Sequence, residues 1–151
     1  MKKKFLAGVL VSCLTASLAT TAFAAEHTVQ MLNGNATGVM VFEPALLNVE
    51  VGDTVTFVPK DMGHNAETVS GLAPDGSASF KGELSKPVTF TVDKEGVYVV
   101  QCNPHAIMAM VGVIVAGAPT NLADIQAKAT TYSEKFVMNK ERLTQILAQI
   151  K

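Results

Sequence analysis

Seven short runs rich in β-branched residues follow one another between His27 and about Ala116, and they constrain the fold more than any other feature of the chain. Turn-forming stretches separate them, such as NGN at 33–35, PDG at 74–76 and DKEG at 93–96. The runs are 28–32, 39–42, 47–51, 54–58, 88–92, 97–101 and 111–115. Short strands with turns at regular intervals predict an antiparallel β-sandwich or barrel.

After Gly117 the pattern becomes helical. The stretch PTN at 119–121 indicates the start of a helix that Asn121 would cap, and Asn139 would cap a second helix. One apolar stripe of that second helix, spaced i, i+3, i+4 and i+7, consists of Leu143, Ile146, Leu147 and Ile150. We expect one domain, with the sandwich in residues 25–117 and the helices of residues 118–151 packed on it.

Residues 1–24 have the pattern of a cleaved signal peptide: lysines at 2–4, an apolar segment at 5–18, and AFA before Ala25. A membrane anchor is disfavoured because the apolar segment is shorter than a spanning helix. The stretch LVSC, ending at Cys13, resembles a lipoprotein site, but the apolar segment continues beyond it to a better cleavage site. We therefore expect a periplasmic protein without a membrane segment, and the mass of the mature protein would test whether Cys13 is lipidated.

Removal of the signal changes the charge. Nine of the twelve Lys and Arg residues remain against thirteen Asp and Glu, giving a net charge of about −4. A mildly acidic surface argues against nucleic acid as a partner. Cleavage also leaves Cys102 as the single cysteine, so no internal disulfide can form and the thiol is buried, reactive or bound to a ligand.

The segment CNPHAIMAM at 102–110 collects soft donor atoms: Cys102, His105, Met108 and Met110. Earlier in the chain, His64 follows the strand-like run 54–58. It can complete a coordination sphere that a single loop cannot close. Two imidazoles, a thiolate and a distant thioether suit copper in an electron-transfer site, because they satisfy both Cu(I) and Cu(II). Zinc fits this donor set less well, because structural zinc normally takes four Cys or His ligands. The remaining histidine of the mature chain, His27, is interpreted as a surface residue.

The order His64, then Cys102-x-x-His105-x-x-x-x-Met110, resembles that of the type-1 (blue) copper proteins, the cupredoxins, and most closely the pseudoazurins. The stretches that carry the resemblance are MLN (31–33), GVMVFEPA (38–45), VGDTVTFVP (51–59), GHNAET (63–68), PDG (74–76) and CNPHAIMAMVG (102–112). The resemblance implies an eight-stranded, all-β Greek-key sandwich with two C-terminal helices and copper near one end. It implies that His64, Cys102 and His105 are the strong ligands and Met110 the axial ligand.

Met108 is the competing axial ligand. In amicyanins the methionine lies six residues after the cysteine, whereas in pseudoazurins and plastocyanins it lies eight after. Met110 is favoured because it also directly precedes the next strand-like run.

The resemblance further implies three supporting roles. Asn65 would connect the histidine loop to the cysteine loop and direct its backbone amide at the sulfur. Pro104 would remove a competing amide near that sulfur, and Met40 would pack against the His105 ring.

These observations predict a monomeric periplasmic electron carrier rather than an enzyme. Electrons would pass through the edge of His105, and the implied partner is a copper nitrite reductase, a c-type cytochrome or another periplasmic oxidoreductase. Positions that are usually basic in pseudoazurins fall here on Gly34, Met62, Glu83 and Gln101, so charge steering should be weak.

Two other functions stay open at this level. Cys102 could be the nucleophile of a thiol enzyme activated by a histidine, although such cysteines usually lie in positive, partly exposed positions. Met108 and Met110 could instead belong to a copper chaperone or store that binds and releases Cu(I).

Overall fold

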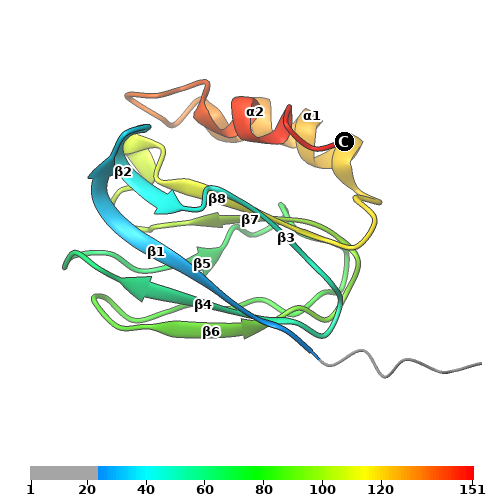
Figure 1. Ribbon diagram of the computed structural model, residues 1–151. Coiled ribbons are helices and arrows are strands. Elements are labelled where there is room, and N and C mark those ends of the chain that lie inside the picture. The colour runs from blue at the N-terminus through cyan, green and yellow to red at the C-terminus, as the bar shows by residue number, and fades with distance from the viewer. Residues whose placement is uncertain (1–23) are drawn as a thin grey trace, which may run out of the picture.

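The computed structural model describes residues 24–151; the expected signal segment lies, except for Ala24, outside the described residues. Two four-stranded sheets face each other, with strand orders β2-β1-β4-β6 and β3-β8-β7-β5 (Figure 1). The strands are β1 (Glu26–Asn35), β2 (Gly38–Glu43), β3 (Leu46–Val49), β4 (Thr54–Pro59), β5 (Glu67–Thr68), β6 (Val88–Thr91), β7 (Gly96–Gln101) and β8 (Val111–Ala116). The predicted sandwich is confirmed.

Each of the seven expected runs contains a strand, but the pairing is not wholly antiparallel. β1 pairs with β4 in parallel, and β3 pairs with β8 in parallel. The expectation of an antiparallel sandwich is wrong in this respect. The chain leaves the first sheet after β2, runs through β3 in the second sheet and returns as β4, so that β4 arrives beside β1 in the same direction. Parallel neighbours require such long crossover connections.

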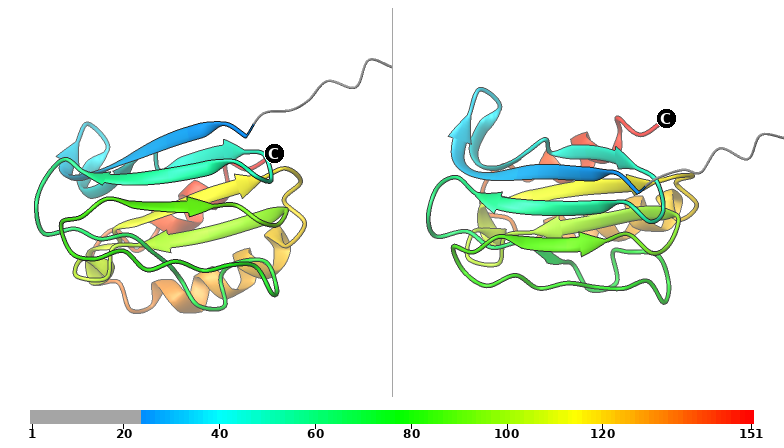
Figure 2. Two further views of the ribbon diagram at one scale, coloured as in Figure 1. Left: turned by 90° about the horizontal axis from the view of Figure 1, so that it is seen from below. Right: turned by 60° about the horizontal axis from the view of Figure 1, so that its bottom comes forward.

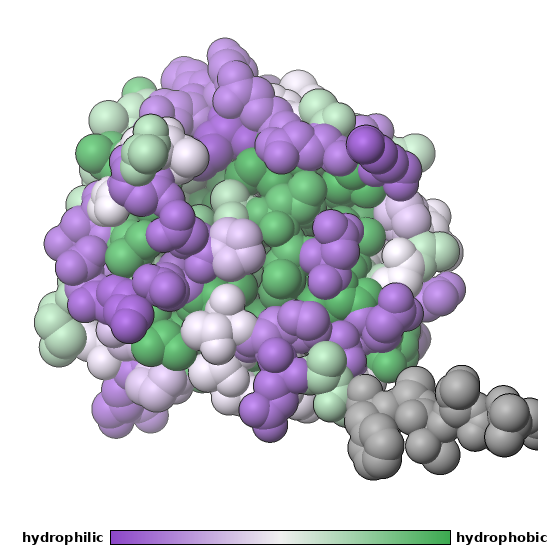
Figure 3. Space-filling view, in the orientation of Figure 1, coloured by the Kyte–Doolittle hydropathy of each residue, from purple (hydrophilic) through white to green (hydrophobic). Residues whose placement is uncertain are grey.

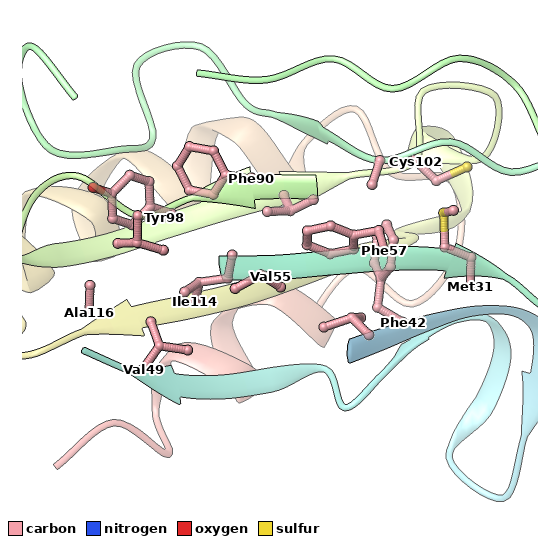
Figure 4. Close-up of a cluster of buried hydrophobic side chains, with 14 of the residues drawn as sticks. Met31, Phe42, Val49, Val55, Phe57, Phe90, Tyr98, Cys102, Ile114 and Ala116 are labelled. Atoms are coloured by element: carbon pink, nitrogen blue, oxygen red, sulfur yellow. The ribbon is translucent and has the colours of Figure 1, made fainter. Parts of the chain in front are cut away.

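The space between the sheets is filled by one apolar cluster. Its largest members are aromatic: Phe42, Phe57, Phe90 and Tyr98. Figure 4 shows Cys102 and Met31 at one end of the cluster and Tyr98 and Ala116 at the other. The thiol therefore lies at the edge of the core.

Two helices, α1 (Leu122–Ser133) and α2 (Arg142–Leu147), cover the outer face of the second sheet. In the left panel of Figure 2 they lie behind the strands. Their contacts form a second apolar cluster, which includes Val97, Val113, Ile125, Phe136, Leu143 and Ile146. The stripe of the second helix is thus buried as expected, although the helix ends at Leu147, before Ile150.

Neither predicted cap is formed by its side chain. Asn121 does precede α1, but its amide donates to the carbonyl of Val97 at 3.0 Å and accepts the Val97 N–H at 2.7 Å. Asn139 lies three residues before α2, and its side chain reaches Met108 instead. Both side-chain amides bond to backbone groups outside their own helix. The local sequence does not reveal such partners.

Apolar residues gather in the centre of the face in Figure 3, between α2 and β1, and hydrophilic residues frame them. A groove there is lined by Phe42, Leu46, Val111 and Ile146. Across residues 24–151, the helices are too short and too polar to traverse a bilayer.

Candidate metal centre

Two loops at one end of the sandwich carry the expected site residues. His64 follows β4, and Cys102 is the first residue after β7. The two-residue strand β5 pairs Glu67 with Gln101, which places the histidine loop beside the end of β7. This strand was not predicted, because two residues carry no periodicity.

The structure brings His64, Cys102 and His105 together. The Cys102 Sγ lies 3.7 Å from His64 Nδ1 and 3.5 Å from His105 Nδ1, and the two Nδ1 atoms are 3.1 Å apart. A trigonal site with bonds of about 2.0 Å to nitrogen and 2.3 Å to sulfur would space its ligand atoms by about 3.5–3.7 Å. The sulfur–nitrogen distances agree with this spacing and the two nitrogens lie closer than it, so the three donor atoms can surround one metal ion with a small outward shift of the imidazoles.

The ligand loop closes on itself beside these residues. The N–H of Cys102 donates to the carbonyl of Met110 at 2.9 Å, and the N–H of Met110 donates to the carbonyl of His105 at 3.2 Å. Between them lies the short 3-10 helix η1 (Ala106–Met108). Met110 is fully buried and belongs to the same apolar cluster as Cys102, whereas Met108 is half-buried.

A hydrogen bond fixes the orientation of the His64 ring. Its Nε2 lies 3.0 Å from Asn33 Oδ1, which can only accept, so Nε2 carries the proton and the lone pair of Nδ1 faces the cysteine. Burial, and secondarily the charge of His105, lower the pKa of His64, whereas Asp61 opposes the shift. The ring is therefore neutral, as a metal ligand must be. No local pattern in the sequence marks Asn33 as a partner of His64, although Asn33 belongs to the MLN stretch.

Burial raises the pKa of the Cys102 thiol. The backbone amides of Asn65 and His105 act in the opposite direction, and the nearby Glu67 raises the pKa further. Without a cation, the sulfur is thus held as a thiol, which is a poor nucleophile. A metal ion would supply the positive charge that stabilises the thiolate.

Asn65 connects the two loops as expected. Its Oδ1 accepts the backbone N–H of Asn103 at 2.7 Å, and its Nδ2 donates to the carbonyl of Gly82 at 3.2 Å. The same Nδ2 lies 3.4 Å from the buried carboxylate of Glu67, which also accepts from Gln101 Nε2 at 2.8 Å. These buried polar groups hold the backbone around the sulfur.

His27 is not part of the cluster, and it is not a plain surface residue either. Its Nε2 lies 2.8 Å from Asp53 Oδ2, and its side chain is 25% exposed. Asp53 also accepts the backbone N–H groups of Ala25 at 2.7 Å and Glu50 at 3.0 Å. Hydrogen bonds from Glu50, His27 and Ala25 lower the pKa of Asp53 to about 2. The expectation for His27 missed this carboxylate because it lies 26 residues away in the sequence.

Residues 29–117 match the family model of copper-binding proteins of the plastocyanin/azurin family. The chain is 43% identical to pseudoazurin of Paracoccus pantotrophus over 135 residues, which cover 89% of this chain and 90% of that one. The chain belongs to the pseudoazurin family. Two solved pseudoazurins support the assignment at the level of structure. That of Hyphomicrobium denitrificans is 41% identical with a TM-score of 0.71, covering 83% of this chain and 98% of its own. That of Methylobacterium extorquens is 38% identical with a TM-score of 0.73, covering 83% and 99%.

Copper is the metal of this family, and the donor set in the chain fits it. A buried cysteine with two converging imidazoles matches the His₂Cys arrangement of type-1 copper sites.

Proposed function

We propose that this protein carries single electrons between periplasmic redox proteins on one copper ion held by His64, Cys102, His105 and Met110. Copper supplies the one-electron couple between Cu(I) and Cu(II). The observation that supports the proposal most strongly is the convergence of one sulfur and two Nδ1 atoms to within 3.7 Å of one another. The chain's own residues supply rigidity, exclude water and provide a route to the surface.

Burial supports Met110 rather than Met108 as the axial ligand. Met110 is inaccessible to solvent and lies in the same cluster as Cys102, and its backbone is hydrogen-bonded to both Cys102 and His105. Met108 is half-buried and forms the last residue of η1. A weak axial thioether needs a fixed position, which the buried methionine has.

The surface around His105 suits a docking partner. The His105 ring is half-buried, whereas the other two donor residues are inaccessible, so His105 gives the shortest covalent connection from the site to solvent. Exposed apolar side chains occupy segments next to the ligand loops: Val39, Met62, Leu84, Ile107, Val137 and Met138. Redox partners typically meet over a small interface that separates quickly, and an apolar surface of this kind fits that requirement.

The charges near this surface favour a partner whose encounter with the protein does not depend on strong electrostatic steering. Lys81 lies 3.9 Å from Glu67, and Lys86 pairs with Glu83 at 2.5 Å. A c-type cytochrome, a copper nitrite reductase or another periplasmic oxidoreductase could meet it through apolar contact. We propose that the protein acts as a monomer in the periplasm after cleavage of residues 1–24.

The two other functions fit the site less well. A buried Cys102 with a raised pKa does not suit a thiol enzyme, so we propose that the chain is not an enzyme. A copper store needs accessible ligands for release, whereas Met110, His64 and Cys102 are inaccessible.

Cyclic voltammetry with simultaneous copper analysis distinguishes an electron carrier from a copper store. A carrier gives a reversible one-electron wave and keeps one copper per chain through repeated oxidation and reduction, even with a Cu(I) chelator present. Loss of copper to the chelator on each reduction would support storage and contradict electron carriage.

A further inference from the structure

The ligand loop is contacted at three successive residues by the connector between α1 and α2 and by Arg142, the first residue of α2. The carbonyl groups of residues 107–109 each accept one hydrogen bond from these segments. Val137 donates its backbone N–H to the first at 2.8 Å, Asn139 donates Nδ2 to the second at 3.4 Å, and Arg142 donates Nη1 to the third at 3.0 Å. These carbonyls lie in the segment between His105 and Met110. In Figure 1 the connector lies at the same end of the molecule as the turn between β1 and β2.

Arg142 also reaches the first sheet. Its Nη1 donates to the carbonyl of Met40 at 2.8 Å, and its Nη2 donates to that of Val39 at 3.1 Å. Arg142 is the single arginine of the chain. Its planar fork of donors thus joins α2, β2 and the ligand loop, an arrangement that a lysine ammonium cannot reproduce.

Two of the carbonyls bound by Arg142 belong to residues in an unusual backbone conformation. Met40 has φ of 50° and Ala109 has φ of 58°, in the left-handed region that residues with a Cβ rarely adopt. Such a conformation persists only when surrounding contacts hold it. The guanidinium supplies contacts of this kind to both.

The sequence also leaves room for the guanidinium. A Cβ at Gly38, whose φ is 144°, would lie 2.9 Å from Arg142 Nη2. The glycine therefore permits both its own backbone conformation and the close approach of the arginine.

The positive charge of Arg142 has no neutralising partner among residues 24–151. The ion pairs found there involve other residues, and Arg142 donates to backbone carbonyls. Burial lowers the pKa of Arg142, but a guanidinium stays charged at any physiological pH. A fixed positive charge near a redox centre favours the less positively charged oxidation state.

We propose that Arg142 is a positioning residue of the copper site, which clamps the loop between His105 and Met110 and raises the reduction potential. This inference rests on the copper site proposed above. The C-terminal helices then have a role in the redox site: α2 carries Arg142, which together with the preceding connector fixes the ligand loop. Rigid ligands need little rearrangement when the oxidation state changes, so the clamp also favours fast electron transfer.

Three variants test the two contributions separately. Arg142→Met removes charge and donors at similar length, and Arg142→Lys keeps the charge but loses the fork. Lys140→Met is the matched control, because it removes one positive charge from an exposed position on the connector two residues before Arg142. The readouts are amide hydrogen exchange at residues 107–111 in the copper-free protein, and the reduction potential of the copper-loaded protein.

Arg142→Met should speed exchange in the ligand loop several-fold and shift the Cu(II)/Cu(I) equilibrium roughly two- to tenfold toward Cu(II). A tenfold shift corresponds to a potential lower by about 59 mV for one electron. Arg142→Lys should retain most of the potential but not the protection from exchange, and Lys140→Met should change neither. Unchanged exchange and potential in Arg142→Met would overturn the inference.

Asn139→Gly provides a second test if Arg142→Met does not fold. Glycine tolerates the φ of 52° at this position and removes only the bond to Met108, so exchange in the loop should rise while the potential stays the same. No rise would count against the connector's part in holding the loop. Arg142→Lys then tests Arg142 itself, and wild-type protection from exchange in that variant would overturn the inference. A wild-type protein that fails to bind copper as a blue site would instead refute the proposed function, whatever the variants show.

Discussion

The side chain of Asn65 accepts the backbone N–H of Asn103 at 2.7 Å and thereby joins the loop that contains His64 to the loop that contains Cys102. His64 directly precedes Asn65, and Cys102 directly precedes Asn103. One amide thus helps to set the distance between imidazole and sulfur before any metal binds.

Replacement of Asn65 by Ala should destabilise the copper-free protein by about 1–3 kcal/mol, because the N–H of Asn103 and the carbonyl of Gly82 lose a buried partner. Urea denaturation measures the change. Asn48→Ala, at an exposed position on β3, is the control and should have little effect. Equal losses in the two variants would show that Asn65 does not join the loops.

Met110→Leu should change the visible spectrum and raise the reduction potential. Loss of a donor atom and more apolar surroundings both disfavour the more highly charged Cu(II) state. Met108→Leu should change neither appreciably, since that side chain is half-buried on η1. Potentiometric titration followed by absorbance gives both quantities, and a larger effect of Met108→Leu would reverse the assignment of the axial ligand.

Asp53 should make the stability of the fold depend on pH in the acid range. Its pKa is lowered from 3.8 to about 2 in the folded protein, mainly by the backbone hydrogen bond from Glu50 and by His27. A group with a lowered folded pKa stabilises the fold fully above its unfolded pKa, and this contribution is lost as pH falls toward the folded value. The difference in Tm between wild type and Asp53→Asn should therefore be constant above about pH 5 and shrink between pH 4 and 2.

Differential scanning calorimetry of the copper-free proteins provides the measurement. Asp124→Asn, on the exposed face of α1, is the matched control. A Tm difference for Asp53→Asn that stays constant down to pH 2 would contradict the role assigned to this carboxylate.

Electron transfer to the partner should depend weakly on ionic strength. Two lysines in segments beside the docking surface are accompanied by carboxylates, Lys81 by Glu67 and Lys86 by Glu83, so these two contribute little net charge to steer an encounter. Stopped-flow mixing with a c-type cytochrome and with a copper nitrite reductase, at increasing salt, measures this. A steep fall of the rate with salt would contradict the apolar mode of docking.

The strands and the donor residues could be predicted because their signals lie in residues that are close together in the sequence. The β-branched runs between turn-forming stretches predicted the strands, and the spacing from Cys102 to His105 and Met110 predicted the ligand loop. The role of Asn65 followed from the resemblance to pseudoazurins rather than from any local pattern.

What sequence reasoning missed depends on contacts between distant residues. The caps expected at Asn121 and Asn139 failed because each amide meets backbone from another element. The pairing of His27 with Asp53 and of His64 with Asn33 also spans more than 25 residues. A parallel pairing such as that of β1 and β4 leaves no signature within either strand.

The absorption spectrum of the copper-loaded, oxidised protein shows whether Cys102 and two histidines bind one copper ion. If they do, we expect an intense visible band from thiolate-to-Cu(II) charge transfer, at one copper per chain, that disappears in Cys102→Ser and is lost or strongly altered in His64→Ala. A wild-type protein that stays colourless with Cu(II) bound, or a band that survives in Cys102→Ser, would contradict it.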